Sequence, residues 1–277
     1  MDKARGFDRD TFLRSRQKLA VGKQALHYVV MNPEVPERFH EHRTALLTPG
    51  FMCGLSNMAL LGYELTRYGY QVVAISHENP NRAPEDIRAV LEAYYEGKLT
   101  PAIYPISLIS HSLGAVNSVD ALSRYSDLPD AVHDMLHLAP AGYGGVTPSM
   151  ALASIVVELS HRPSSQAVRD AVADALRYTL DSGTDMLHLI KRASRSDVTD
   201  ETRQLAQDGL PISALVSHRD LLIHARPLTE GLALAGTPHD YVGVGRAGHN
   251  AHLMFPGEVA AQVAEKIAAS YDQPSAA

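Results

Sequence analysis

Short apolar runs of strand length recur along the chain, each bounded by turn residues. Between them lie segments with apolar residues at helical spacing, the last with Val259, Val263 and Ile267 four positions apart. Because strands and helices alternate, we predict an α/β fold: a mostly parallel central sheet with helices on both faces. The predicted strands are Arg43–Thr48, Gln71–Ser76, Pro105–Ile109, Met135–Ala139, Pro211–Ser217 and Asp240–Val244, and the predicted helices are Leu55–Tyr68, Pro84–Glu96, Leu113–Tyr125 and Pro256–Ser270.

Two segments depart from this alternation. Lys18–Met31 predicts an antiparallel hairpin at the edge of the sheet. From residue 147 to residue 208 the pattern is helical throughout, and this stretch lies between two predicted strands. We therefore predict a helical cap over residues 147–208, inserted into an α/β core formed by residues 1–146 and 209–277. Ordinary outer helices are the alternative for this stretch.

Composition excludes several classes of protein. With 277 residues, 45% of them hydrophobic, the chain can bury a large core. The net charge of -6 is spread without basic blocks, so we expect no nucleic-acid partner. The single cysteine, Cys53, excludes an intramolecular disulfide. The first 18 residues are charged throughout and lack the apolar stretch of a signal peptide, and no later run approaches the roughly 20 apolar residues of a membrane span, so we expect a cytoplasmic protein without membrane insertion. The fourteen histidines are scattered without a cysteine or carboxylate cluster, so we expect no metal site.

A serine lies where the third predicted strand turns into a helix, in the run Ser110-His111-Ser112-Leu113-Gly114. A nucleophile elbow holds its serine on such a turn and needs small residues two positions before and after it. Ser110 and Gly114 fill these positions, although glycine is usual at the first. The N–H of Leu113, at the start of the helix, is the predicted oxyanion donor. Helix capping by the two serines is the alternative when this run is considered alone.

Three other segments supply the groups that Ser112 would need. The first predicted strand ends in a loop where the N–H of Phe51 or Met52 is expected to face the elbow. Asp220 directly follows a late strand, at the sheet edge where sites of parallel sheets gather. His249 lies just before the last helix. Because a serine hydroxyl needs a base, and the base needs a group that holds its tautomer, we predict Ser112 as nucleophile, His249 as base and Asp220 as orienting acid.

Other polar residues compete for these roles. His111 is expected to point away from the nucleophile into the scaffold, and His252 follows the predicted base by three residues; each is an alternative base. We assign both, together with His77, to the lining of the substrate site. Asp240 is an alternative acid only if its strand is placed in the wrong register, because it begins that strand and would lie at the opposite end of the sheet.

These features together resemble the α/β-hydrolase superfamily over roughly residues 43–270. The resemblance rests on the loop that begins at Pro49, the SHSLG elbow, the aspartate after a late strand, and the Gly-His pair that ends at His249. Many relatives have His-Gly where this chain has Pro-Gly, and glycine where it has Ser110. The resemblance implies cleavage of esters, thioesters, amides or lactones, and a cap inserted where residues 147–208 lie. Relatives that open epoxides or remove halogens carry aspartate at the elbow, so serine argues against those reactions.

We therefore predict a serine hydrolase that cleaves an ester, thioester, lactone or amide of a small, fairly hydrophobic acyl substrate. The reaction would pass through an acyl-enzyme on Ser112 and need no cofactor. One alternative is a lyase, cyclase or perhydrolase that uses the same triad. Another is a ligand-binding protein on the same scaffold, which tight binding without turnover would indicate. The substrate and the oligomeric state cannot be read from the sequence.

Overall fold

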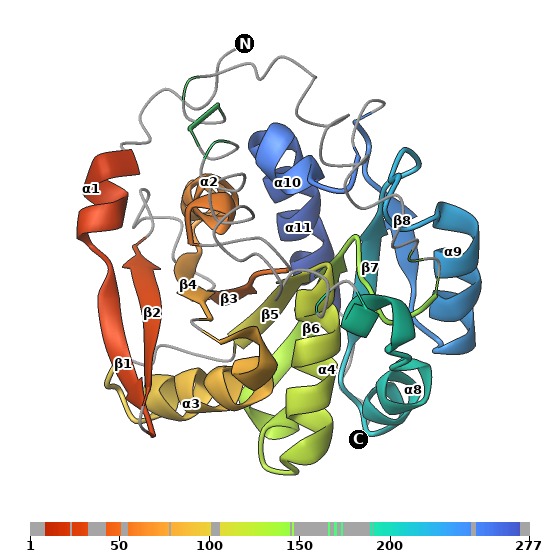
Figure 1. Ribbon diagram of the computed structural model, residues 1–277, viewed down its shortest axis with the longest axis horizontal. Coiled ribbons are helices and arrows are strands. Elements are labelled where there is room, and N and C mark those ends of the chain that lie inside the picture. The colour runs from red at the N-terminus through yellow and green to blue at the C-terminus, as the bar shows by residue number, and fades with distance from the viewer. Residues whose placement is uncertain are drawn as a thin grey trace.

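The computed structural model describes residues 9–22, 24–32, 43–50, 55–77, 79–100, 106–144, 146, 166, 169, 170, 173, 189, 191–244 and 248–271. These residues contain one eight-stranded sheet with the strand order β1-β2-β4-β3-β5-β6-β7-β8 (Figure 1). The first two pairings, β1 with β2 and β2 with β4, are antiparallel, and the others are parallel. The strands are β1 Gln17–Val21, β2 Gln24–Met31, β3 Thr44–Thr48, β4 Gln71–Ser76, β5 Ile106–His111, β6 Val132–Leu138, β7 Ile212–Val216 and β8 His239–Tyr241. The mostly parallel sheet and the hairpin at its edge are therefore confirmed.

Helices cover both faces of this sheet, as the sequence predicts. Among the described residues, two separate clusters of buried apolar side chains hold them there, one between the sheet and α3, α4, α8 and α9, the other between the sheet and α2 and α11. The three residues spaced four apart in the last helix, Val259, Val263 and Ile267, are all buried in the second cluster. The helices are α1 Arg9–Arg14, α2 Leu55–Thr66, α3 Ala83–Tyr95, α4 Leu113–Arg124, α8 Thr199–Gln207, α9 Ala225–Leu234, α10 Ala251–Met254 and α11 Pro256–Tyr271, with short 3-10 turns η2 Pro80–Arg82 and η3 Pro129–Ala131.

Some element boundaries differ from the prediction. Strand β5 continues two residues beyond the predicted end at Ile109, through His111. The prediction stopped too early because Ser110 and His111 are polar, although both are buried. The last strand, β8, spans His239–Tyr241 rather than Asp240–Val244. Helix α9 was not predicted, since it begins with a weak Ala-Arg-Pro pattern and buries only a narrow stripe of residues.

Most of the predicted cap, residues 147–208, lies outside the described residues. Its described end includes α8, which packs against α4 and α9 and buries Leu205 in the core. This helix is thus part of the layer that flanks the sheet. The cap as a whole stays a prediction.

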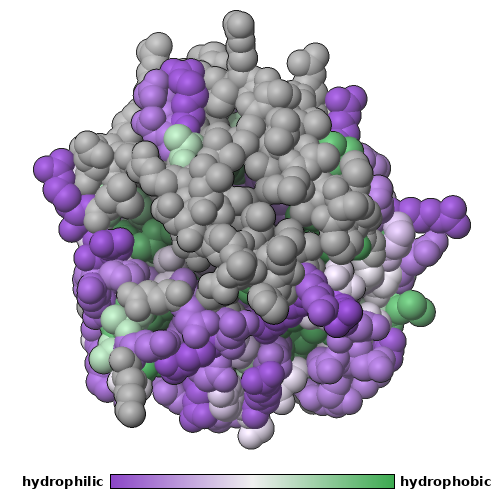
Figure 2. Space-filling model, viewed as in Figure 1, coloured by the Kyte–Doolittle hydropathy of each residue, from purple (hydrophilic) through white to green (hydrophobic). Residues whose placement is uncertain are grey.

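The described surface in Figure 2 is largely hydrophilic, with small separate hydrophobic areas. Within the described part of the chain, none of the helices combines the length and the apolar character that crossing a membrane requires.

One carboxyl group is buried against the C-terminal helix. Oδ2 of Asp134 on β6 accepts a hydrogen bond of 2.5 Å from the hydroxyl of Ser270 on α11. Burial raises the pKa of Asp134 to about 6. Beside this pair, the ring of Tyr271 stacks on His133 and lies under the guanidinium of Arg43. Polar and aromatic contacts therefore attach the end of α11 to the sheet.

Candidate active site

Ser112 lies on the tight turn between β5 and α4, in a strained conformation with φ 52° and ψ -121°. A backbone of this kind costs on the order of 1–3 kcal/mol and persists only where the surrounding structure holds it. Three hydrogen bonds do so here. The N–H of Ser112 donates to the carbonyl of Leu138 at 3.0 Å, and its own carbonyl accepts from the N–H groups of Ala115 and Ala141 at 3.0 and 3.1 Å. The turn therefore projects the serine side chain out of the strand while its backbone groups stay paired.

Two glycines let the end of β3 pass close to this turn. A Cβ atom on Gly114 would lie 2.8 Å from the carbonyl oxygens of Thr48 and Pro49. A Cβ atom on Gly50 would lie 2.7 Å from the Cβ of Ser112. Since real Cβ atoms do not approach so closely, both positions require glycine, which supports the interpretation of this run as a nucleophile elbow.

The unusual serine at the first small position has a partner that the sequence did not identify. Ser110 is buried, and its hydroxyl lies 2.6 Å from Nδ1 of His137 on the neighbouring strand β6. Burial lowers the pKa of His137 to about 3, so its ring is neutral at physiological pH. The extra hydroxyl is therefore hydrogen-bonded in the interior rather than left unpaired.

The three predicted catalytic side chains meet at the carboxyl ends of the parallel strands. Nε2 of His249 lies 2.9 Å from the Oγ of Ser112, and its Nδ1 lies 2.8 Å from Oδ2 of Asp220. The other carboxylate oxygen, Oδ1, accepts the backbone N–H groups of Leu222 and Ile223, each at 2.8 Å. Because a carboxylate can only accept, Nδ1 carries the imidazole proton and the lone pair of Nε2 faces the serine hydroxyl. This arrangement allows the imidazole to take the serine proton.

The predicted oxyanion donors are partly described. Leu113 is the first residue of α4, so its N–H has no acceptor within the helix and lies at the positive end of the helix dipole, next to Ser112. Phe51 and Met52 lie outside the described residues. The donor expected from their loop stays a prediction.

The three histidines predicted to line the substrate site are all buried, with exposed fractions of 1% for His111 and His252 and 8% for His77. The ring centroid of His111 lies 4.1 Å from that of His252 and 4.9 Å from that of His249. His77 lies at the end of β4, with Nδ1 3.0 Å from Oδ2 of Asp86. These contacts are with protein groups, and a role in substrate binding stays a prediction.

The alternative acid lies elsewhere. Asp240 is exposed on β8, and its carboxylate pairs with the ammonium group of Lys266 on α11. Among the described residues, no group of three or more histidine, cysteine, aspartate or glutamate side chains is arranged to hold a metal ion.

Comparison with known proteins identifies the type of fold. No protein-family model matches this chain. No curated protein gives a significant sequence match. Among solved structures, a protein proposed to be an aryl esterase from Burkholderia cenocepacia is 13% identical with a TM-score of 0.65, over 93% of this chain and 100% of its own. An esterase from Pyrococcus furiosus is 14% identical with a TM-score of 0.62, over 92% and 89%. An E-2-(acetamidomethylene)succinate hydrolase is 19% identical with a TM-score of 0.63, over 91% and 98%. At such identities the similarity shows the fold alone: this chain has the α/β-hydrolase fold, as its motifs imply.

Proposed function

We propose that this protein is a serine hydrolase of carboxylic esters and related acyl compounds, which acts through an acyl-enzyme on Ser112. The observation that carries the proposal is the continuous line of hydrogen bonds from Ser112 through His249 to Asp220, at a strained strand-to-helix turn. Strain of this kind clusters at functional sites, and a chain of this kind is what activates a hydroxyl near neutral pH.

The first half of the reaction forms the acyl-enzyme. Nε2 of His249 takes the proton of Ser112 as its Oγ attacks the carbonyl carbon of the substrate. Asp220 stabilises the resulting imidazolium through the hydrogen bond at Nδ1. The negative charge on the substrate oxygen develops near the first turn of α4, where the N–H of Leu113 donates to it. The imidazolium then gives its proton to the leaving group, and the carbon–oxygen or carbon–nitrogen bond breaks.

The second half releases the acid. A water molecule gives a proton to His249 and attacks the acyl carbon, and the same proton returns to Ser112 when the ester bond to the enzyme breaks. Each proton transfer uses groups of the chain itself, and no cofactor enters either step. The loop that carries Phe51 and Met52 would provide the second oxyanion donor, and the predicted cap would cover the acyl group. The esterase and the hydrolase described above as sharing this fold support this class of reaction.

Labelling with a fluorophosphonate tests the proposal, because such a probe reacts with activated serines. Peptide mass spectrometry should find one adduct, on Ser112, in the unaltered protein. Ser112→Ala should abolish it, and His249→Ala should slow its formation at least 100-fold, with circular dichroism confirming that both variants are folded. Folded protein without an adduct on Ser112 would contradict the proposal. An adduct without release of the chromophore from short aryl esters would favour the lyase, cyclase or perhydrolase alternative.

A further inference from the structure

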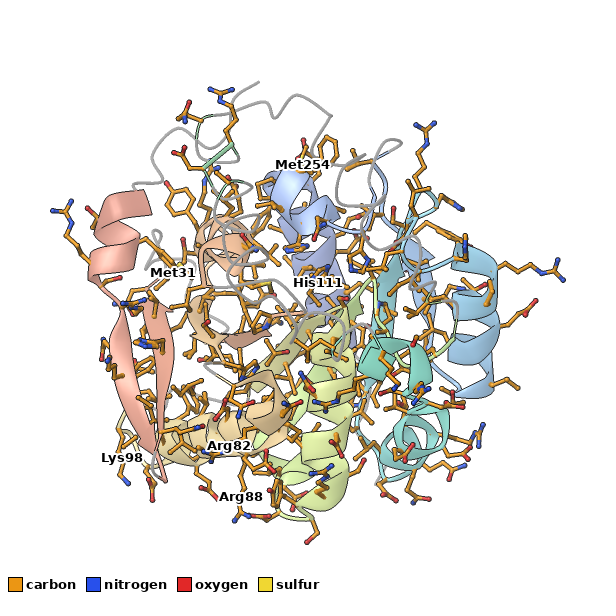
Figure 3. All side chains as sticks on the ribbon, in the orientation of Figure 1. Met31, Arg82, Arg88, Lys98, His111 and Met254 are labelled. Carbon is orange, nitrogen blue, oxygen red and sulfur yellow. The ribbon has the colours of Figure 1, made fainter. Side chains whose placement is uncertain are left out.

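His111, labelled in Figure 3, is buried in the interior at the end of β5 that leads into Ser112. On one side its Nε2 lies 3.1 Å from the backbone carbonyl oxygen of His249. On the other side its Nδ1 lies against Gly50, so closely that a Cβ atom there would be 2.9 Å away. A single ring thus contacts the main chain of the predicted base and the main chain that leads into the predicted oxyanion loop.

The hydrogen bond to His249 fixes where the proton of this ring lies. A carbonyl oxygen can only accept, so Nε2 of His111 must carry a proton. Burial lowers the pKa of His111 well below its usual value, and the nearby rings of His252 and His249 lower it further. The ring is therefore neutral, with its one proton on Nε2.

The ring of His252 also packs against the ring of His111. The two centroids are 4.1 Å apart, and His252 is itself buried on α10. Burial lowers the pKa of His252 to about 3, so this ring is also neutral. Two uncharged imidazoles therefore pack beside the catalytic one and add no positive charge to oppose the imidazolium that forms during the reaction.

The hydrogen bond between His111 and His249 joins two different kinds of segment. His111 is the last residue of β5, directly before Ser112, and its strand is paired on both sides by parallel neighbours. His249 belongs instead to a loop, just before the short helix α10. The hydrogen bond from Nε2 of His111 thus joins a strand that is paired on both sides to the main chain of the predicted base.

We propose that His111 is a positioning residue: the proton on its Nε2 fixes the main chain of His249 and thereby the distance from the base to the Ser112 hydroxyl. This inference rests on the proposed function. It gives His111 a role that acts through another residue, His249. A misplacement of about 1 Å at a reacting group can lower the rate about 100-fold, so this one bond carries a measurable effect.

Two substitutions at His111 separate the hydrogen bond from the volume of the ring. In His111→Gln the amide nitrogen reaches about where Nε2 lies and can donate to the same carbonyl, whereas His111→Leu fills similar space without a donor. We expect His111→Leu to lower kcat and the rate of fluorophosphonate labelling by about 10- to 100-fold, with KM changed less than about 3-fold. His111→Gln should restore both rates to within about 3-fold of the unaltered protein. A Leu variant with an unchanged rate, or a folded Gln variant as slow as the Leu variant, would overturn the inference.

A measurement on the unaltered protein tests the inference even if the His111 variants fail to fold. Nuclear magnetic resonance of histidine ring nitrogens should show His111 neutral, protonated at Nε2, and not titrating between about pH 5 and pH 8. A proton on Nδ1, or titration in this range, would refute the inference whatever the variants do.

If the unaltered protein forms no adduct on Ser112, the proposed function fails and the positioning role fails with it. If the unaltered protein is labelled normally and the His111→Leu variant is labelled at the same rate, only the role of His111 is refuted.

Discussion

Replacing Asp220 by asparagine should inactivate the protein by forcing the wrong imidazole tautomer. In the aspartate, Oδ1 accepts two backbone N–H groups while Oδ2 accepts the proton on Nδ1 of His249. Asparagine keeps one of these oxygens and replaces the other by an NH₂ group, which only donates. The side chain must therefore direct its amide either at the two N–H groups or at the histidine.

The counts of hydrogen bonds decide which orientation is adopted. An amide group turned toward the backbone would leave two buried N–H donors unpaired, at about 1–3 kcal/mol each. Turned toward His249 it keeps those bonds and donates to Nδ1, provided that the ring proton moves to Nε2. Nε2 then has no lone pair for the proton of Ser112. We expect a loss of about 10⁴-fold in kcat, or about 5.5 kcal/mol of transition-state stabilisation, in a protein that remains folded.

The rate of fluorophosphonate labelling at neutral pH measures this loss, with thermal unfolding as the test of folding. Asp240→Asn is the matched control, because it makes the same chemical change at an exposed carboxylate that pairs with Lys266. That variant should be labelled within about twofold of the unaltered rate, since exposed ion pairs have small effects. A folded Asp220→Asn protein that keeps more than about a tenth of the rate would refute the tautomer argument.

Three further substitutions test the packing of the site and of the sheet. Gly114→Ala should lower the free energy of unfolding by about 1–3 kcal/mol, because the new Cβ would lie 2.8 Å from carbonyl oxygens at the end of β3; an unchanged melting temperature would contradict this. Ser110→Ala should cost about 1–3 kcal/mol, since it removes the 2.6 Å partner of the buried His137 ring, and denaturant unfolding would show whether it does. Burial raises the pKa of Asp134 to about 6 in the folded protein, above its value in the unfolded chain. Between about pH 4 and pH 6 the folded protein therefore holds a proton on Asp134 that the unfolded chain has lost, and its stability falls as the pH rises through this range. The difference corresponds to about 3 kcal/mol, so Asp134→Asn should be more stable than the unaltered protein at pH 8 but not at pH 3; an identical pH dependence would rule out a buried charge there.

The fold could be predicted from the sequence because its strands are short apolar runs between turn residues. The candidate nucleophile, acid and base could be proposed for a related reason, since Ser112 and Asp220 each follow a strand and His249 precedes the two final helices, of which only α11 was predicted. Such positions depend on the order of elements along the chain, which the pattern of apolar residues reveals. Elements that bury little apolar surface, such as α9 and the short β8, leave a weak pattern and were missed or misplaced.

Pairs of buried polar groups could not be predicted in the same way. Ser110 meets His137 because the two are opposite each other in the β5–β6 register, and a register is a property of two strands rather than of either one. His77, directly after β4, meets Asp86 on α3, a contact that depends on how this helix packs beside the strand. From the sequence alone, these histidines are polar residues near strand ends. Such a position is equally compatible with the lining of a pocket and with a contact in the interior.

The distance along the chain between the candidate nucleophile and its base affects when the protein becomes reactive. Ser112 and His249 are separated by 137 positions, and strands β6, β7 and β8 lie between them. A chain emerging from the ribosome thus completes its elbow long before the imidazole arrives, and until then the serine is an ordinary alcohol. On the proposed mechanism, reactivity appears only when the C-terminal helices dock on the sheet, so that labelling of Ser112 during refolding would report this late event directly.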